Sequence, residues 1–296
     1  MLILRADELG MCFGVRDALA VLAGVPEPSV VTIHGELVHN PEVLADLDRR
    51  GFHRSPEAAR PVPATPTVLV TAHGISERER RRLAAAGKVL LDTTCPLVSK
   101  AHAAAQALQA EGRRVVVIGK RDHVEVRGLV EDLQDAIVVD SLAEVRSWPG
   151  ERLGVVCQTT TPVALADEVV AAVRRANPGV DVRVVDTICS PTRARILALD
   201  ALLPRVDAIV VVGGRHSNNT KQLVQRAKAA GVPALHVESA NELAAAWFVG
   251  RRVVGLTAGT STLDRTIAEV EGWLRALAAS TAGAAGRAGV GVPGAR

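Results

Sequence analysis

The chain of 296 residues has few aromatic side chains. They make up 2% of the sequence, with three Trp, three Phe and no Tyr. Nucleobases are therefore not expected to stack on aromatic platforms. The 35 Lys and Arg are interspersed with 32 Asp and Glu, so the formal net charge is only +3 and no basic stripe forms. We expect no nucleic-acid partner.

The sequence also lacks long apolar runs. None reaches the length that spans a bilayer, and the opening MLILRADELG has no charged leader followed by an apolar stretch and a small-residue cleavage site. We therefore expect a cytoplasmic protein with no membrane partner. Only four cysteines occur. In a cytoplasmic protein they are more typical of metal or redox chemistry than of structural disulfides.

Short β-branched runs recur along the chain and predict an α/β fold. Most are continuous rather than alternating, which is typical of strands buried on both faces. Amphipathic stretches rich in Ala and Leu lie between them, and several end at a Gly. This alternation predicts parallel sheets covered by helices. The predicted strands lie at 2–6, 29–33, 67–72, 88–94, 114–119, 153–158, 182–188, 208–214, 234–237 and 252–258.

Division after each cysteine-bearing strand gives three comparable α/β units, each expected to hold a small parallel sheet. They span residues 1–94, 95–188 and 189–278, without a residue-level repeat. From residue 279 to 296 the composition collapses to Ala, Gly and a few polar residues. We expect this end to be a flexible tail with no fold of its own.

Three of the four cysteines share one sequence context. Cys12, Cys95 and Cys189 occur at near-regular intervals, each where a strand-like run gives way to a helical pattern. A helix N-terminus stabilises a thiolate, and three thiolates could meet at an iron-sulfur cluster while leaving one iron open to substrate. The alternative is three ordinary strand-end cysteines. Cys157 lies inside an apolar run, so we expect it to be buried and not a ligand.

Four histidines lie in polar strand-end or loop contexts, namely His39, His73, His123 and His216. Imidazole N–H groups can donate to phosphate oxygens, and several convergent histidines could bind a diphosphate without a metal. Each one taken alone is more often structural.

Two further segments place small polar residues between a buried strand and a helix: VVVGGRHSNNTKQL and TAGTSTLDRTI. Hydroxyls, amides and backbone N–H groups at a helix N-terminus form an anion site, although N-capping explains the same residues. Neither segment is a Walker loop or a dinucleotide fingerprint, so neither a purine nucleotide nor a Rossmann dehydrogenase is indicated. The residues concerned are Ser217, Asn218, Asn219, Thr220 and Ser261.

Glu125, two residues after His123, is a candidate proton donor. A carboxyl group in a closed site can stay protonated near neutral pH, whereas most such glutamates are simply solvated. Thr159 follows a buried strand, where its hydroxyl could relay a proton or hold a substrate hydroxyl.

Taken together and in this order, these motifs resemble the 4-hydroxy-3-methylbut-2-enyl diphosphate reductase (LytB) family over about residues 10–275. These enzymes catalyse the last step of the methylerythritol phosphate route to isoprenoids. The resemblance implies three α/β units around one central 4Fe-4S cluster, an allylic diphosphate substrate, and an electron donor such as ferredoxin or flavodoxin. It implies cluster ligation by Cys12, Cys95 and Cys189, a proton-delivering Glu125 and a hydroxyl-contacting Thr159. The implied diphosphate-binding residues are His39, His73, His123, Ser217, Asn218, Asn219 and Ser261.

The chain departs from the family pattern in places. Asn218 stands where a second Ser is common, Ala194-Arg195-Ile196 replaces Asn-Arg-Gln, and Leu263 replaces a frequent Pro. These differences leave open a paralogous iron-sulfur reductase that acts on another allylic substrate. A non-enzymatic iron-sulfur sensor is the alternative from another class, but it leaves the His, Ser and Asn donors unexplained.

Overall fold

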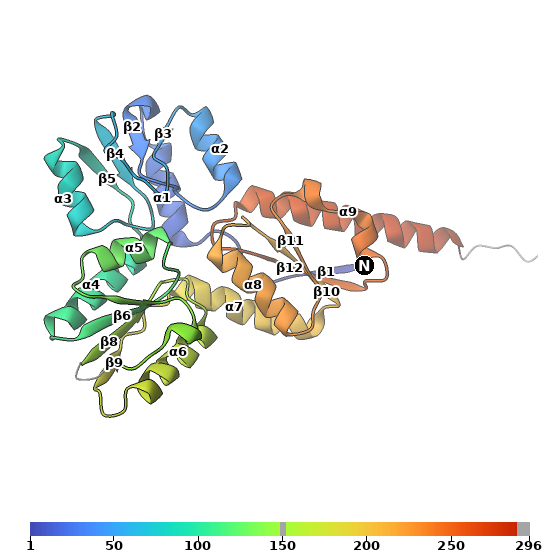
Figure 1. Ribbon diagram of the computed structural model, residues 1–296. Helices are drawn as coiled ribbons and strands as arrows, with labels where there is room; N and C mark the ends of the chain where they lie inside the picture. Colours follow the sequence, from blue (N-terminus) through green and yellow to red (C-terminus); the bar gives the residue numbers. More distant parts are fainter. Residues whose placement is uncertain (149–151, 289–296) are drawn as a thin grey trace, which may run out of the picture. The chain divides into compact units, whose positions relative to one another are not determined.

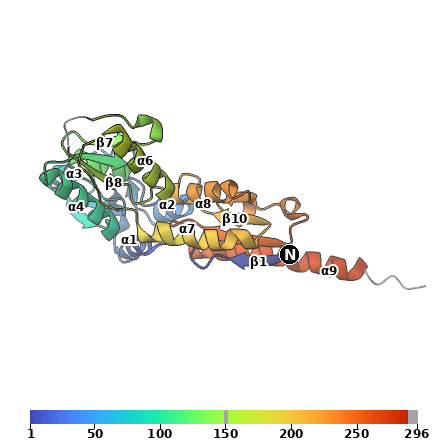
Figure 2. The same cartoon turned by 90° about the horizontal axis from the view of Figure 1, so that it is seen from below.

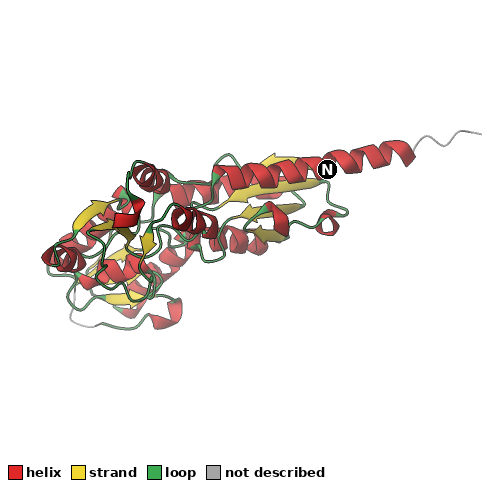
Figure 3. Ribbon diagram, turned by 90° about the horizontal axis from the view of Figure 1, so that it is seen from above, coloured by secondary structure: helices red, strands yellow, loops and turns green. Residues whose placement is uncertain are grey.

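The computed structural model describes residues 1–148 and 152–288 (Figure 1). Within these ranges the strands form three four-stranded sheets in which every pair is parallel. Figure 3 shows these strands among helices. The predicted α/β class with small parallel sheets is therefore confirmed. The chain divides into two compact units: unit 1 contains Met1–Met11 and the residues from Ala194 onward, and unit 2 is Cys12–Arg193.

Unit 2 contains two of the sheets. The elements of its first part are α1 (Phe13–Ala23), the 3-10 helix η1 (Pro28–Val30), β2 (Val31–Ile33), α2 (Pro41–Arg49), β3 (His53–Arg54), β4 (Thr67–Val70), α3 (Glu77–Ala85) and β5 (Val89–Asp92). The strand order is β3–β2–β4–β5. In β4, Val68 and Val70 share one face, as the period of two in a strand requires, and pack in one cluster with Ile75 and Leu83.

The second part of unit 2 is a sheet with helices on both faces. Its elements are α4 (Pro96–Ala110), β6 (Arg114–Ile118), α5 (Val124–Glu131), β7 (Ile137–Val139), η2 (Leu142–Glu144), β8 (Leu153–Cys157), α6 (Val163–Ala176) and β9 (Val182–Val184). The strand order is β7–β6–β8–β9. In β6, Val115 and Val117 pack with α4 and α5, whereas Val116 and Ile118 pack with α6. Both faces are buried, as the continuous apolar run predicted.

Unit 1 repeats this arrangement around the third sheet. Its elements are β1 (Leu2–Arg5), α7 (Ser190–Leu202, which begins in unit 2), η3 (Leu203–Arg205), β10 (Ala208–Val212), α8 (Asn218–Ala229), β11 (Ala234–Val237), η4 (Ala240–Glu242), η5 (Ala245–Phe248), β12 (Val253–Ala258) and α9 (Asp264–Ala288). The strand order is β1–β12–β10–β11. Helices α7 and α8 cover the face with Ile209 and Val211, and α9 covers the face with Val210 and Val212 (Figures 1 and 2).

Two expectations from the sequence need correction. β1 pairs with β12, so residues 2–5 belong to the last sheet rather than to the sheet of segment 1–94. The run of apolar residues gave the strand correctly, but it carries no information on which sheet edge the strand joins.

The tail expected from residue 279 is helical as far as Ala288, because alanine favours helix and extending an existing helix is easier than starting one. Residues 289–296 lie outside the described part of the chain.

Two short strands, β3 and β7, were missed. β3 has only two residues, too few to show a periodicity, whereas the apolar run that contains β7 does not differ in kind from the predicted run at 234–237. The segment boundaries at residues 94 and 188 stay a prediction. Among the described residues, no helix combines the length and the apolar character needed to cross a membrane.

Candidate functional site

Three of the four histidines singled out in the sequence come together in unit 2. The ring centroids of His39, His73 and His123 lie 5.1 to 5.4 Å apart, and one nitrogen of each ring lies within 4.8 Å of the others. Each follows a strand end, in the loops after β2, β4 and β6. Because carboxyl ends of parallel strands open toward the same edge of a sheet, residues far apart in sequence meet there. The fourth, His216, lies in unit 1 and is exposed.

His123 is fixed by the helix that it starts. It is the N-cap of α5, and its Nδ1 accepts a hydrogen bond from the Glu125 backbone N–H at 3.1 Å. A neutral ring that accepts at Nδ1 carries its proton at Nε2, so a donor is left for a ligand. Burial, assisted by His39 and Arg60, lowers the pKa of His123 to about 3. The ring is therefore neutral at physiological pH.

The other two rings are held in different ways. His39 Nδ1 lies 2.8 Å from Glu36 Oε2, and the carboxylate accepts from the ring N–H. The next residue, Asn40, caps α2 by accepting from the backbone N–H groups of Glu42 and Val43. Burial holds the pKa of His73 well below its usual value, and the charges of His39, His123 and Arg60 act in the same direction. At neutral pH, His73 therefore contributes an uncharged ring.

Glu125 and Thr159 form a buried pair. Glu125 is 2% exposed, and its two carboxyl oxygens accept from the Thr159 backbone N–H at 2.6 Å and from the Thr159 hydroxyl at 3.0 Å. Burial raises the pKa of Glu125 to about 7, although both hydrogen bonds from Thr159 lower it. A carboxyl group with this pKa can hold a proton at neutral pH and give it up, as a general acid must.

The three cysteines with a shared sequence context also lie in unit 2. Cys12 and Cys95 are the N-caps of α1 and α4, and Cys189 directly precedes α7. All three are free thiols and partly buried. Gly14, in the first turn of α1, has no side chain in the space next to the Cys95 thiol. A Cβ at Gly14 would lie 2.6 Å from Cys95 Sγ, so the glycine permits this close approach.

Backbone contacts attach the cysteines to the rest of the site. The Cys95 N–H donates to Ala72 O at 3.0 Å, next to His73, and the Cys189 N–H donates to Thr159 O at 2.9 Å. Burial raises the pKa of Cys95 and of Cys189, and the charges of Cys12 and Glu125 raise both further. The backbone bonds thus place Cys95 beside the loop of His73, and Cys189 beside the Thr159 that bonds to Glu125.

Cys157 differs from the other cysteines. It is the last residue of β8 and is buried, as expected from its apolar run. Burial raises the pKa of its thiol to about 12. A side chain held this firmly in its neutral form inside the core is suited to packing rather than to ligation.

The polar segments of unit 1 also meet one another. Ser217 caps α8 by accepting from the Thr220 N–H at 3.3 Å, and Asn219 Oδ1 accepts from the Thr260 N–H at 3.0 Å. The second contact joins the start of α8 to the loop that carries Ser261. Asn219 Nδ2 is buried and has no hydrogen-bond partner among the described residues, so it is available as a donor. Asn218 is the first residue of α8.

Sequence reasoning missed the acidic and basic residues that support the histidines, by a hydrogen bond or by their charge. Glu36 bonds to His39, and Arg60 lies close enough to affect the pKa of both His73 and His123. Glu36 stands three residues before His39, a spacing that offered a weak signal. Arg60 lies in a segment of no regular structure, and nothing in its sequence context distinguishes it from the other arginines.

A family model described as "LytB protein" matches residues 3–275. The chain belongs to this family. A relative from Anaeromyxobacter sp. (strain K), named 4-hydroxy-3-methylbut-2-enyl diphosphate reductase, is 37% identical over 276 residues, which cover 92% of this chain and 98% of the relative. A relative of the same name from Methylibium petroleiphilum is 37% identical over 287 residues, covering 94% and 86%. The resemblance seen in the sequence is confirmed.

Solved structures agree with this assignment. One, described as (E)-4-hydroxy-3-methyl-but-2-enyl diphosphate reductase, the terminal enzyme of the non-mevalonate pathway, is 31% identical, with a TM-score of 0.67 and coverage of 93% of this chain and 100% of that chain. A second, the E-1-hydroxy-2-methyl-but-2-enyl-4-diphosphate reductase from Plasmodium falciparum, is 25% identical, with a TM-score of 0.83 and coverage of 93% and 87%.

Proposed function

We propose that this chain converts 4-hydroxy-3-methylbut-2-enyl diphosphate into isopentenyl and dimethylallyl diphosphate by removing the allylic hydroxyl. One observation carries the proposal: unit 2 gathers three free thiols, three histidine rings and a carboxyl group of pKa about 7. These are the groups that the reaction needs from a protein, namely ligands for a redox cofactor, donors for a diphosphate, and a proton for a departing hydroxyl. Relatives matched over most of the chain carry the name of this reductase.

The LytB family implies an iron-sulfur cluster, and the cysteines of unit 2 fit one. Cys12, Cys95 and Cys189 are soft ligands at the starts of three different helices. At Cys95 and Cys189, hydrogen bonds from backbone N–H groups favour the thiolate and act against the larger effect of burial. We propose that these three cysteines are the protein ligands of one 4Fe-4S cluster. When bound, such a cluster supplies electrons and, with three protein ligands for four irons, an open Lewis-acidic iron.

The proposed role of the histidines is to hold the diphosphate. His123 presents an Nε2–H donor because its Nδ1 is occupied by the backbone of α5. His39 and His73 lie against it, and one ring nitrogen of each of the three lies within 4.8 Å of the others. We propose that Ser217, Asn218, Asn219 and Ser261 of unit 1 also bind the substrate. N–H and O–H donors fixed in this way stabilise anionic oxygens without reorganising.

Glu125 and Thr159 would supply the proton that converts the allylic hydroxyl into water. Removal of the hydroxyl consumes two electrons and two protons overall: one proton leaves in the water and the other ends on the allyl carbon chain. Glu125 holds a proton near neutral pH, and the Thr159 hydroxyl bonded to it can turn to pass that proton on. The electrons come from an external donor, for which we propose a ferredoxin or flavodoxin.

Anaerobic reconstitution followed by product analysis tests the proposal. The purified chain, loaded with iron and sulfide and then reduced, is expected to yield both isoprenoid diphosphates from 4-hydroxy-3-methylbut-2-enyl diphosphate. Iron and sulfide counts are expected to fall in Cys95→Ser. Cys157→Ala is the matched control, because this cysteine is buried in β8, and it should keep its cluster.

The outcomes separate the alternatives. A cluster-loaded chain that reduces only a different allylic substrate is the paralogous reductase. A loaded chain with no turnover on any allylic diphosphate is the non-enzymatic sensor. A colourless protein after competent reconstitution, or equal iron content in Cys95→Ser and Cys157→Ala, contradicts the cysteine assignment.

A further inference from the structure

Arg60 is held by unit 2 in a conformation that costs energy. Its side chain is 8% exposed, and its backbone has φ of +34°, in a region that residues other than glycine rarely occupy. Arg82 Nη2 donates to the Arg60 carbonyl at 2.8 Å, and the Arg60 N–H donates to Pro56 O at 3.2 Å. A buried guanidinium on a strained backbone indicates that its surroundings fix this group in place.

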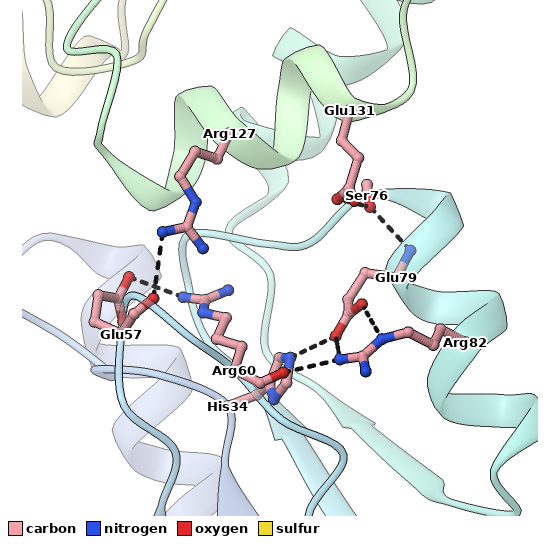
Figure 4. A network of polar contacts seen from close by, with 8 residues as sticks. All are labelled: His34, Glu57, Arg60, Ser76, Glu79, Arg82, Arg127 and Glu131. Carbon is pink, nitrogen blue, oxygen red and sulfur yellow. Dashed lines mark hydrogen bonds and ion pairs between the residues drawn. The ribbon is translucent and has the colours of Figure 1, made fainter.

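A continuous line of contacts leads from Arg60 to the histidine cluster. Arg60 Nη2 donates to Glu57 Oε1 at 2.9 Å (Figure 4). The other oxygen of that carboxylate, Glu57 Oε2, accepts from the Glu36 backbone N–H at 2.6 Å. The Glu36 carboxylate in turn accepts from His39 Nδ1 at 2.8 Å. Each link is at hydrogen-bond distance, so the guanidinium, the Glu57 carboxylate and the turn before His39 belong to one hydrogen-bonded network.

Gly35 leaves the space that this arrangement needs. Its φ of +100° favours glycine, and a Cβ here would lie 2.2 Å from Glu57 Oε2 and 2.5 Å from Arg60 Nη2. The Arg60–Glu57 ion pair therefore packs directly against the backbone of the turn. Because every donor and acceptor in the line is a side chain or backbone group of unit 2, the line is built into one compact unit.

The charge of Arg60 also acts on the histidine cluster. It contributes to the lowered pKa of both His73 and His123, after the larger effect of burial. Of the groups around Arg60, Glu57 and Glu79 oppose its charge and Arg127 has the same sign. Because the Glu57 carboxylate pairs with the guanidinium, the pair brings no net charge to the site, and we expect Arg60 to act through its contacts rather than by attracting the anion itself.

We propose that Arg60 is a positioning residue of the diphosphate site, acting through Glu57 and the turn at Glu36 to hold His39 in place for the ligand. This inference rests on the proposed function only in taking the histidine cluster as the diphosphate site. Arg60 itself is not assigned a contact with the substrate. Its effect on binding must therefore depend on the presence of His39.

A double-mutant cycle on the full-length, cluster-loaded chain tests this dependence. The probe is inorganic diphosphate, and its dissociation constant is measured by calorimetry under anaerobic conditions. Arg60→Gln is expected to weaken binding about tenfold, within the range of coupling between residues of one hydrogen-bonded network. In the His39→Ala background the same change should cost less than about twofold, because the group it positions is absent.

Three further variants accompany the double-mutant cycle: one control and two that test the charge of Arg60 and the next link in the network. Arg49→Gln removes an exposed arginine on α2 that pairs only with Asp46 among the described residues, and it should bind diphosphate like the parent. Arg60→Lys keeps the charge but not the planar fork, and it should recover only part of the loss. Glu57→Gln disrupts the next link with nearly unchanged shape, and its loss of diphosphate affinity should likewise depend on the presence of His39. This variant tests the proposal if Arg60→Gln does not fold.

The results separate this inference from the reductase assignment. Weakening of equal size with and without His39 overturns the positioning role, and so does parent-like binding by both Arg60→Gln and Glu57→Gln. A parent chain that fails to bind diphosphate overturns the site and the inference together. A parent chain that binds diphosphate with the expected coupling, yet forms no product from the allylic substrate, leaves the inference standing and contradicts only the reductase function.

Discussion

Thr159 contacts both carboxyl oxygens of Glu125, one through its backbone N–H at 2.6 Å and the other through its hydroxyl at 3.0 Å. The two residues come from different strand ends, the start of α5 and the loop after β8. The backbone bond fixes the position of the carboxyl group, and the hydroxyl can reverse its bond when the carboxyl is protonated. Together with the raised pKa, this geometry makes Glu125 the strongest candidate for a proton donor in unit 2.

The first prediction concerns the pH dependence of turnover. Glu125 has a pKa of about 7, raised by burial, so its protonated fraction falls as the pH rises through 7. The kcat of the parent should therefore fall on the alkaline side with an apparent pKa near 7. Glu125→Gln should lower kcat by about 10²- to 10⁴-fold, the contribution typical of general acid catalysis, and should lack this alkaline limb. Rates are compared at equal cluster content.

Thr159→Ser is the matched variant for this pair. Serine keeps both the backbone N–H and a hydroxyl, so it should preserve most of kcat, whereas Thr159→Val removes the hydroxyl with little change in volume. If Glu125→Gln turns over at the parental rate, or keeps the alkaline limb, Glu125 does not deliver the proton.

The second prediction separates the two roles of His123. Its Nδ1 caps α5, and within residues 1–148 and 152–288 its Nε2 has no hydrogen-bond partner. His123→Ser keeps a good N-cap but lacks the reach of the ring, so KM should rise about 10- to 100-fold, the value of one hydrogen bond to a charged group, while stability changes little. His123→Ala loses the cap as well, and its unfolding free energy should drop by about a further 1 kcal/mol. Thermal melts and KM measurements on both variants check this.

The third prediction concerns the space beside Cys95. Gly14→Ala would place a Cβ 2.6 Å from Cys95 Sγ, so either the thiol or the start of α1 must move. We expect the iron content after reconstitution to fall, with a loss of about 1–3 kcal/mol in stability from overpacking. Gly24→Ala, at the other end of the same helix, meets its nearest atom at 3.6 Å and has an ordinary φ of −84°, so it should retain iron. Equal iron content in the two variants would argue against a crowded site at Cys95.

Much of the fold follows from the sequence because it depends on local patterns. The continuous run at 208–212 requires burial on both faces, and a parallel sheet between helices provides it. The pairing of β1 with β12 could not be read in the same way, because it joins residues about 250 positions apart in a chain whose strand edges look alike. Local pattern specifies strands, whereas their partners are specified by the packed structure.

The residues of the candidate site differ in the same way: some can be recognised from the local sequence, and others only from the fold. Cys12, His123 and Glu125 can be recognised from the sequence because several reactive residue types recur at strand ends in one chain, although each of them alone is more often structural. Arg60, Glu57 and Glu36 do not stand out, because charged residues in polar loops are usually solvated, and only the fold shows that they meet. Supporting residues are therefore the part of a site that sequence reasoning finds last.

The final prediction concerns acid stability and His34. This ring is fully buried, and its Nε2 lies 2.8 Å from Glu79 Oε1. Burial lowers its pKa, although the bond to Glu79 acts in the opposite direction. The folded protein thus resists protonation of His34, and below about pH 6.5 this residue binds more protons in the unfolded chain than in the folded one. The contribution of His34 to the free energy of unfolding should therefore fall as the pH drops below about 6.5, by at most about 1.4 kcal/mol per pH unit.

His34→Gln removes this titration while keeping an N–H donor for Glu79. Its unfolding free energy should depend less steeply on pH between about 6.5 and 5 than that of the parent, although burial of an amide lowers its stability at pH 7. Urea unfolding of both proteins at several pH values gives the two slopes, and acid loss of the cluster cancels in their difference. The exposed His53→Gln is the control and should keep the parental slope. Identical slopes for the parent and His34→Gln would mean that His34 titrates alike in the folded and unfolded chains, contrary to the protection that its burial indicates.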